Sequence, residues 1–303
     1  MYCFAEAMLS WRSHATKKIY QAYLTRWIRP HWQKYELADV RTIQVAWLRG
    51  LPLAKSSCAK IRNLMSVLFN HACRYELFDR NPIYLVRQSA KRRTAPAILM
   101  PAEIKALING LAHRERTLVP LAASTGLRQS ELFGLKWGNV DFDQGTMSVT
   151  RSIVYGVVGP CKTESSQKPV PIHPTLADAL MQWRKPSTSI QPDDWVFASK
   201  RYRGRRPYWG QAILRKYIRP IAQRVGIQKR FGWHTLRHTY STLLRSVGTE
   251  FKVMQELLRH SSLRSTLDVY TGSHAGEARR AGRRAVAGIF LRCERNVTIV
   301  GIR

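Results

Sequence analysis

Six side chains that can take part in phosphate chemistry occupy four short motifs in the C-terminal two thirds of the chain. In chain order they are Arg128, Lys162, His234, Arg237, His260 and Tyr270. The motifs read STGLRQSELFGLKW, GPCKTESSQKPVPI, HTLRHTYSTLL and LLRHSSLRSTLDVY. Guanidinium groups bind a phosphate with paired N–H donors, and a phenol can form a covalent ester with it. The sequence therefore contains the parts of a phosphoryl-transfer site, provided that the fold brings them together.

The first motif places Arg128 at the expected start of a helix, directly after a turn at Gly126. A helix N-terminus leaves backbone N–H groups free, so an arginine there adds fixed charge to a place that suits phosphate. Glu131 follows one turn later and is expected either to orient the guanidinium of Arg128 or to cap the helix. In the third motif, His234 and Arg237 lie on one helix face.

Each motif also has an ordinary structural explanation when it is considered alone. Arg128 can be a solvated surface arginine, and Lys162 can be a solvent-exposed lysine on a hairpin. Tyr270 fits a half-buried position on a helix, and His238 is expected to be structural. Only the combination of the motifs, in this order, favours a functional interpretation.

The order and spacing of the motifs resemble the tyrosine recombinase (phage-type integrase) family over roughly residues 99–290. The resemblance implies a mostly α fold with a small antiparallel β-sheet, in which a helical-bundle core-binding domain precedes an α+β catalytic domain. It implies no cofactor and no metal. The catalytic residues that it implies are Arg128, Lys162, His234, Arg237, His260 and Tyr270.

The roles implied by the resemblance agree with the chemistry of strand cleavage. Tyr270 matches the nucleophile, and Arg128 and Arg237 match the two arginines that clamp the phosphate. A phenol with a pKa of about 10 is mostly neutral at pH 7, so its attack needs a base or strong charge stabilisation. Lys162 matches the hairpin lysine, which can protonate the leaving 5′-oxygen, and Glu131 matches the acidic residue that braces the first arginine.

The chain departs from the family pattern at several places. Arg259 stands where the family often has glycine, and Lys168 stands where an arginine is common. Neither change is expected to affect the chemistry. The additional small N-terminal arm-binding domain of many integrases is expected either to be absent or to have been lost by truncation. A helix predicted over 275–290 resembles a tail that docks on a neighbouring subunit.

The elements that must position these residues fall into two expected domains. Residues 1–90 read as a helical, core-type DNA-binding domain, and 91–98 read as a polar, basic linker. The catalytic domain is expected over 99–290 and a C-terminal tail over 291–303.

Apolar spacing predicts individual elements within these domains. A helix is expected over 16–29, with Pro30 as its stop, a long one from about Lys55 to Tyr75, and another over 128–137. Alternating apolar residues predict a strand over 147–153, and the return strand is expected over 168–173.

The charge of the chain indicates a polyanionic partner. Lys and Arg total 50 against 19 Asp and Glu, a formal net charge of +31. Such a charge favours nucleic acid first and an anionic membrane surface second. The basic positions expected to contact DNA are Lys55, Lys60, Arg62, Arg203, Arg205 and Arg206.

Several functional classes have no support in the sequence. There is no phosphate-binding loop of the GxxxxGK[ST] type, no GxGxxG, and no apolar run as long as a membrane span. The five cysteines form no CxxC pair, which disfavours a disulfide framework and a cysteine-rich zinc site. A cytoplasmic, nucleoid-associated protein without membrane contact is expected.

The expected function is site-specific recombination through a 3′-phosphotyrosine intermediate. The expected partners are double-stranded DNA recombination sites. The free protein is expected to be a monomer and to assemble as a homotetramer on synapsed DNA. Accessory DNA-bending proteins are possible further partners. One alternative is a type IB topoisomerase-like nicking-closing enzyme, which shares the site but needs no synapsis. The other is a catalytically decayed DNA-binding remnant of a mobile element.

Overall fold

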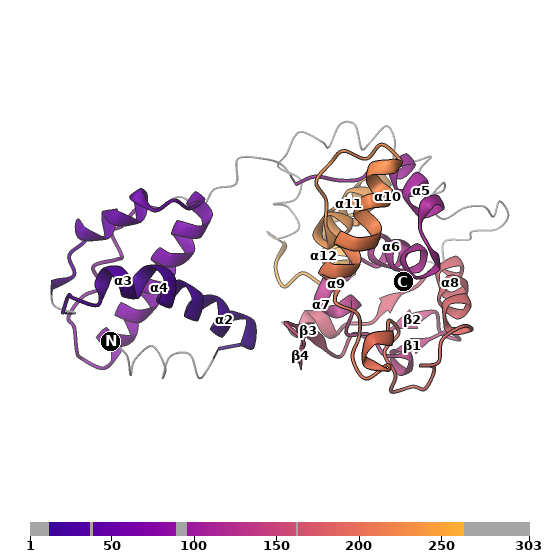
Figure 1. The fold of residues 1–303 in the computed structure, drawn as a ribbon, viewed down its shortest axis with the longest axis horizontal. Coiled ribbons are helices and arrows are strands. Elements are labelled where there is room, and N and C mark those ends of the chain that lie inside the picture. Colours follow the sequence, from indigo (N-terminus) through magenta and orange to yellow (C-terminus); the bar gives the residue numbers. More distant parts are fainter. Residues whose placement is uncertain (1–11, 37–38, 89–95, 162, 264–303) are drawn as a thin grey trace. The chain divides into compact units, whose positions relative to one another are not determined.

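The computed structural model describes residues 12–36, 39–88, 96–161 and 163–263. Lys162, Tyr270, the helix predicted over 275–290 and the tail predicted over 291–303 lie outside the described residues. Over the described residues, helices predominate and the sheets are small and antiparallel (Figure 1). The predicted fold class is therefore confirmed.

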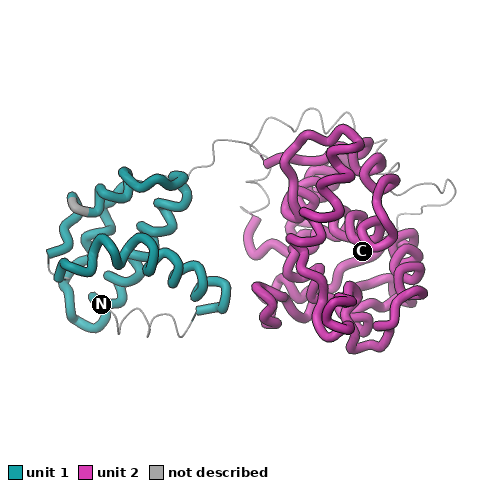
Figure 2. Tube along the Cα trace, in the orientation of Figure 1, with its two compact units in different colours: residues 1–93 teal, residues 94–303 magenta. Residues whose placement is uncertain are grey.

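The chain divides into two compact units, Met1–Arg93 and Thr94–Arg303 (Figure 2). The boundary between the units falls inside the stretch predicted to be a linker, 91–98. Each unit has a hydrophobic cluster of its own. Each can therefore be described as a separately packed body.

The first unit opens with a continuous helical run in three parts: α2 (His14–Tyr23), the π-turn η1 (Leu24–Ile28) and α3 (Arg29–Trp32). The prediction that Pro30 ends this helix is wrong, because helical backbone continues to Trp32. Proline lacks an N–H and therefore removes one of the regular hydrogen bonds of an α-helix. A wider π-turn lets the helical backbone continue past such a residue. The π-turn directly before Pro30 provides that local change.

The remaining elements of the first unit are the 3₁₀ segment η3 (Gln44–Gly50) and the long helix α4 (Lys55–Arg74). Apolar residues recur along α4 at helical spacing and face the core. The core residues of this unit are Leu24, Ile28, Trp32, Val40, Val45, Leu48, Ile61, Leu64, Met65, Leu68, Phe69 and Ile83. This small bundle leaves the charged residues of α4 on its outer positions.

The second unit is built mainly of helices. In chain order these are α5 (Pro101–Gly110), α6 (His113–Thr125), α7 (Gln129–Leu132), α8 (Pro174–Arg184), α9 (Gly210–Ile213), η7 (Leu214–Ile218), α10 (Arg219–Arg224), α11 (Trp233–Ser246) and α12 (Phe251–Leu257). Helices α6 and α11 pack against each other, and α12 packs against α11. These contacts bring the ends of segments far apart in sequence to one place. The helix predicted over 128–137 is much shorter than expected, because only α7 is α-helical there.

Two short antiparallel sheets lie beside these helices. The first has the order β1-β2-β5, formed by β1 (Val140–Asp141), β2 (Thr146–Met147) and β5 (Val170–Pro171). The second is the hairpin of β3 (Ser152–Val154) and β4 (Val157–Gly159). The strand predicted over 147–153 is thus divided between the two sheets.

Candidate active site

Arg237 is turned inward by the packing of α11. Trp233 and Leu236, on the same helix, are buried in the core of the second unit, and Trp233 Nε1 donates to the carbonyl of Gly210 at 3.0 Å. Arg237 is only 5% exposed, and an arginine is rarely buried to that extent unless its guanidinium is paired.

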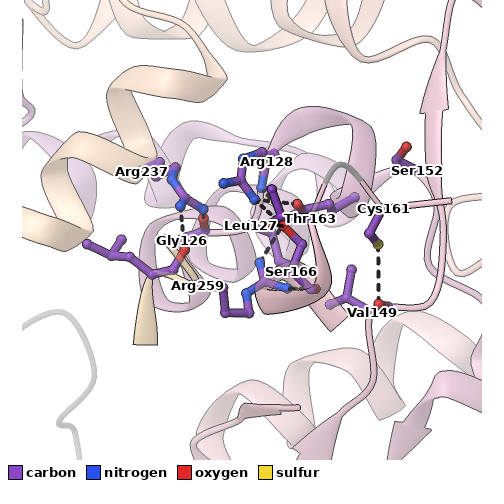
Figure 3. Close-up of polar contacts among 12 residues, drawn as sticks. Gly126, Leu127, Arg128, Val149, Ser152, Cys161, Thr163, Ser166, Arg237 and Arg259 are labelled. Atoms are coloured by element: carbon purple, nitrogen blue, oxygen red, sulfur yellow. Dashed lines mark hydrogen bonds and ion pairs between the residues drawn. The ribbon is translucent and has the colours of Figure 1, made fainter. Parts of the chain in front are cut away.

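The guanidinium of Arg237 joins two other motifs. Nη1 donates to the carbonyl of Gly126 (Figure 3). Nη2 donates to the carbonyl of Leu258. Gly126 lies two residues before Arg128, and Leu258 lies two residues before His260. The structure therefore brings the first, third and fourth motifs together at the side chain of Arg237.

Arg128 is held at the N-terminus of α7, where it is the N-cap residue. Its backbone N–H donates to Glu131 Oε2 at 3.0 Å, and its Nη1 donates to Glu131 Oε1 at 2.7 Å. Glu131 therefore both caps the helix and orients the guanidinium, the two roles between which the sequence left a choice. Arg128 Nη1 also donates to Ser166 Oγ at 2.9 Å (Figure 3).

Arg259 is part of the same cluster, although the sequence reasoning gave it no role. Its Nη2 donates to Glu131 Oε2 at 2.7 Å, and its Nη1 donates to the carbonyl of Ser166 at 3.0 Å. The residue is 1% exposed and has a φ of 53°, the left-handed region that favours glycine. The one available signal was an arginine at a position where a glycine is common, directly before His260.

Positive charge exceeds negative charge in this cluster. Burial raises the pKa of Glu131, but the charges of Arg259 and Arg128 outweigh burial and hold it below its ordinary value. Burial and the charge of Arg128 lower the pKa of Arg237 to about 9, and burial also lowers the pKa of Arg259. With a pKa of about 9, Arg237 stays ionised at neutral pH. Glu131 can balance only one of the positive charges, so the site suits an anion.

The two candidate histidines differ in their surroundings. His260 is half-buried at the end of α12, and burial together with the charges of Arg237 and Arg128 lowers its pKa to about 4. His260 is therefore neutral at pH 7, and the same burial and positive charges make it a weak base. His234 is exposed in the first turn of α11 and lines a hollow that is also lined by Arg128, Tyr208 and Gln211.

Hydrogen bonds hold the residues on both sides of Lys162 in place. Cys161 Sγ donates to the carbonyl of Val149 at 3.3 Å, and the hydroxyl groups of Thr163 and Ser166 are 2.9 Å apart. Ser166 belongs to the 3₁₀ turn η5 (Glu164–Gln167) and contacts both Arg128 and Arg259. This turn therefore belongs to the site, even though Lys162 itself is not described.

The candidate DNA-contact residues of the first unit fall into two groups. Lys55 and Lys60 are exposed on α4. The guanidinium of Arg62 instead donates to the carbonyls of Val86 at 3.1 Å, of Ile83 at 2.8 Å and of Tyr84 at 3.0 Å. Arg62 thus ties the segment after α4 to that helix, a structural role that the sequence did not reveal.

The basic loop of the second unit is ordered and open to solvent. It contains the 3₁₀ turn η6 (Lys200–Tyr202), and Ser199 N–H donates to the carbonyl of Arg206 at 2.8 Å. Arg203, Arg205 and Arg206 are all exposed, and the guanidinium of Arg206 lies 5.4 Å from the centre of the Tyr202 ring. The loop therefore displays several cations from one short, fixed segment.

The described residues contain neither of two features that would indicate other chemistry. Among them, no group of three or more His, Cys, Asp or Glu side chains is placed to hold a metal ion. Over the same residues, no helix is both long enough and apolar enough to cross a membrane.

Comparison with known sequences gives a consistent result over most of the chain. Residues 97–277 match the phage integrase family. The chain is 33% identical over 244 residues to a tyrosine recombinase of Pseudothermotoga lettingae, which covers 78% of this chain and 79% of that protein. It is 28% identical over 240 residues to tyrosine recombinase XerC of Natranaerobius thermophilus, with 78% and 77% covered.

Solved structures are similar in fold at lower sequence identity. The Tn1549 transposon integrase in complex with transposon right end DNA has a TM-score of 0.75 at 19% identity, covering 94% of this chain and 98% of that one. A lambda integrase dimer bound to a COC′ core site has a TM-score of 0.65 at 20% identity, covering 88% and 96%. At these identities the similarity establishes the fold.

Proposed function

The chain belongs to the phage integrase family of tyrosine recombinases, and from that premise we propose how its own residues cleave and rejoin DNA. The protein is a site-specific DNA recombinase. We assign the catalytic roles to Arg128, Arg237, His234 and His260 in the described site, with Lys162 and Tyr270 as general acid and nucleophile. One observation carries most of this assignment: the guanidinium of Arg237 binds the carbonyls of Gly126 and Leu258 and so links three of the four motifs.

Arg128 and Arg237 are proposed to bind the non-bridging oxygens of the scissile phosphate. Each guanidinium has other N–H groups besides those bound to protein acceptors, because an arginine side chain carries five donors. The negative charge of the phosphate grows as phosphorus becomes five-coordinate, so these hydrogen bonds strengthen in the transition state. The excess positive charge around Glu131 supports this role, since a phosphate would balance it.

The proposed reaction exchanges one phosphate ester for another. The phenolic oxygen of Tyr270 attacks phosphorus, the new P–O bond forms, and the bond between phosphorus and the 5′-oxygen breaks. Lys162 supplies the proton that turns the departing 5′-oxygen into a hydroxyl. The phenol proton passes to a base, for which the imidazole of His234 is the proposed acceptor, since the lowered pKa of His260 makes that imidazole a weak base. A 5′-hydroxyl later attacks the 3′-phosphotyrosine, and this reversal rejoins a strand.

The proposed partner is double-stranded DNA that carries the recombination sites. The similar Tn1549 and lambda integrases were solved bound to DNA, and the net charge of +31 favours the same partner here. Lys55, Lys60, Arg203, Arg205 and Arg206 are proposed phosphate contacts, because all five are exposed. Arg62 is proposed to contact a phosphate only in addition to the hydrogen bonds that it donates to backbone carbonyls.

We further propose, from family membership, that four copies act on two synapsed sites and that the free protein is a monomer. Accessory DNA-bending proteins are compatible with this arrangement, as is association with the nucleoid. Sedimentation of the protein alone and with synapsed sites measures the first two points. A single mass for both samples would contradict the assembly on DNA.

The experiment that tests the function traps covalent protein–DNA complexes on a library of genomic fragments and sequences the bound DNA. A recombinase should recover a small set of fragments that share one inverted-repeat site. Recovery of unrelated fragments, with relaxation of supercoiled DNA but no strand exchange, would support a nicking-closing enzyme instead. Absence of any covalent complex would contradict the proposal.

A further inference from the structure

Arg128, the first proposed phosphate clamp, has two side-chain partners in the structure. Its Nη1 donates to Glu131 Oε1 at 2.7 Å and to Ser166 Oγ at 2.9 Å. Glu131 lies on α7 and is 1% exposed, whereas Ser166 lies on the turn η5 and is fully buried. The orientation of the Arg128 guanidinium therefore depends on the relative placement of α7 and η5.

Arg259 holds both of these partners. Its Nη2 donates to the other carboxylate oxygen of Glu131 at 2.7 Å, and its Nη1 donates to the carbonyl of Ser166 at 3.0 Å. One planar guanidinium thus connects α7 and η5, and the geometry of both partners is fixed because the fork is rigid. The close-up in Figure 3 shows Arg259 and Arg128 on the two sides of Ser166.

The environment of Arg259 excludes direct contact with DNA. The residue is 1% exposed, and its side chain lies among buried groups. Its backbone adopts a φ of 53°, which a glycine would adopt more readily. The chain therefore keeps an arginine there with its backbone in an unfavoured conformation. Both Nη groups donate to protein acceptors, whereas the buried Nε has no hydrogen-bond partner among the described residues.

We propose that Arg259 is a positioning residue that fixes Glu131 and Ser166 and thereby orients Arg128 toward the scissile phosphate. The inference rests on the proposed function, since it concerns the same site. It adds a residue that touches neither DNA nor the reacting atoms. Loss of the Arg259 guanidinium should therefore lower the rate of cleavage in the bound complex and leave DNA binding unchanged.

The test compares Arg259→Gly with the parent protein on a nicked suicide duplex that carries the site recovered by covalent trapping. Glycine suits the left-handed backbone, so the variant loses the guanidinium without gaining strain. DNA affinity is measured first, and single-turnover cleavage is then measured at saturating protein. Arg219→Ala is the matched control, because Arg219, on the different helix α10, also donates to a backbone carbonyl, that of Phe231 at 3.2 Å.

The expected result is parent-like DNA affinity with cleavage that is slower by about 10–100-fold in Arg259→Gly, because small misplacement of a catalytic group has effects of that size. The Arg219→Ala control should cleave at the parent rate once bound. If Arg259→Gly fails to fold, Arg259→Lys decides the question. It keeps the charge but lacks the fork, and it should still cleave about 10-fold more slowly than the parent.

A second arm tests whether Arg259 acts through Arg128. In an Arg128→Lys background there is no guanidinium to orient, so adding Arg259→Gly should slow cleavage by less than about threefold. The same rate loss in both backgrounds would overturn the inference, as would parent-like cleavage by Arg259→Gly or Arg259→Lys. Absence of cleavage by the parent would instead overturn the proposed function, and this inference with it.

Discussion

The guanidinium of Arg237 on α11 donates a hydrogen bond to the backbone carbonyl of Gly126, the residue that ends α6. Gly126 has a φ of 61°, and a Cβ atom built there would lie 2.7 Å from Cδ1 of Tyr240 and 3.1 Å from Cδ2 of Leu258. The turn that presents Arg128 therefore depends on a residue without a side chain. The same turn supplies the acceptor that fixes the second clamping arginine.

Gly126→Ala should destabilise the protein and disturb the site. The left-handed backbone and the close contacts together should lower the free energy of unfolding by about 2–4 kcal/mol. Displacement of the carbonyl that holds Arg237 should also slow cleavage by the folded protein. Urea denaturation and single-turnover cleavage measure the two effects. Gly159→Ala is the control, because no atom lies within 4 Å of its Cβ position, and an unfolding free energy equal for both variants would contradict the account.

The basic loop should contribute to the salt dependence of DNA binding. Arg203, Arg205 and Arg206 are exposed on one short segment, and each phosphate contact that is lost should flatten the log–log slope of affinity against salt by about 0.9. Replacing all three with alanine should therefore flatten the slope by about 2–3.

A control with equal charge loss separates this local effect from the overall charge. Lys105, Lys185 and Lys252 are exposed on or next to three separate helices. Their triple alanine variant should change the slope less than the loop variant does. Equal slopes for the parent and the loop variant would remove the loop from the DNA interface.

His260 should make folding stability depend on pH below neutrality. Burial, Arg237, Arg128, His238 and Arg259 lower its pKa to about 4 in the folded protein, whereas an unfolded histidine titrates near 6.5. As the pH falls from about 6.5 toward 4, the unfolded chain takes up a proton that the folded protein does not, so stability falls.

The matched variant isolates this contribution. His260→Gln should flatten the pH dependence of the unfolding free energy between pH 7 and pH 5, as measured by urea denaturation at each pH. An equally steep loss of stability in the variant would show that other groups cause it. Direct NMR titration of the His260 ring above pH 6 would contradict the lowered pKa.

The sequence predicted the elements better than the contacts between them. The apolar spacing predicted a helix from Lys55 to Tyr75, and α4 runs over Lys55–Arg74. The motif order also led to the family, because the types and the spacing of the motif residues can be read directly from the sequence. The end of the first helix was predicted wrongly, since the effect of Pro30 depends on a π-turn that apolar spacing does not reveal.

The contribution of Arg259 could not be predicted for a different reason. Its partner Glu131 lies 128 residues away in the chain, and only the packing of α6, α11 and α12 brings them together. Arg62 shows the same limit, because its carbonyl acceptors lie 21 to 24 residues further along. Basic residues look alike in sequence, whether they face DNA or protein.

Lys162 should be recognised as a general acid by a change of leaving group. Lys162→Ala should cleave an ordinary scissile phosphate about 10²–10⁴-fold more slowly than the parent. A 5′-bridging phosphorothiolate releases a thiolate, which leaves without a proton because a thiol has a pKa near 8.5. On that substrate, the variant should recover most of the parent rate.

Arg128→Ala is the control for this experiment. Its defect concerns charge on the non-bridging oxygens, which sulfur in the bridge does not remove, so no rescue is expected. Equal defects of Lys162→Ala on both substrates would remove Lys162 from the acid role. Rescue of both variants would show that the sulfur substrate simply reacts faster.

The covalent intermediate is the central claim, and Tyr270→Phe on a nicked suicide substrate tests it most directly. The variant loses one oxygen and little volume, so its DNA affinity should equal that of the parent. The parent should accumulate a protease-sensitive covalent adduct, and the phenylalanine variant should form none. Tyr240→Phe should keep the adduct, since burial raises the pKa of Tyr240 to about 12 and makes it a poor nucleophile. A covalent adduct formed by Tyr270→Phe would contradict the account and turn attention to a nearby serine, Ser262 or Ser265.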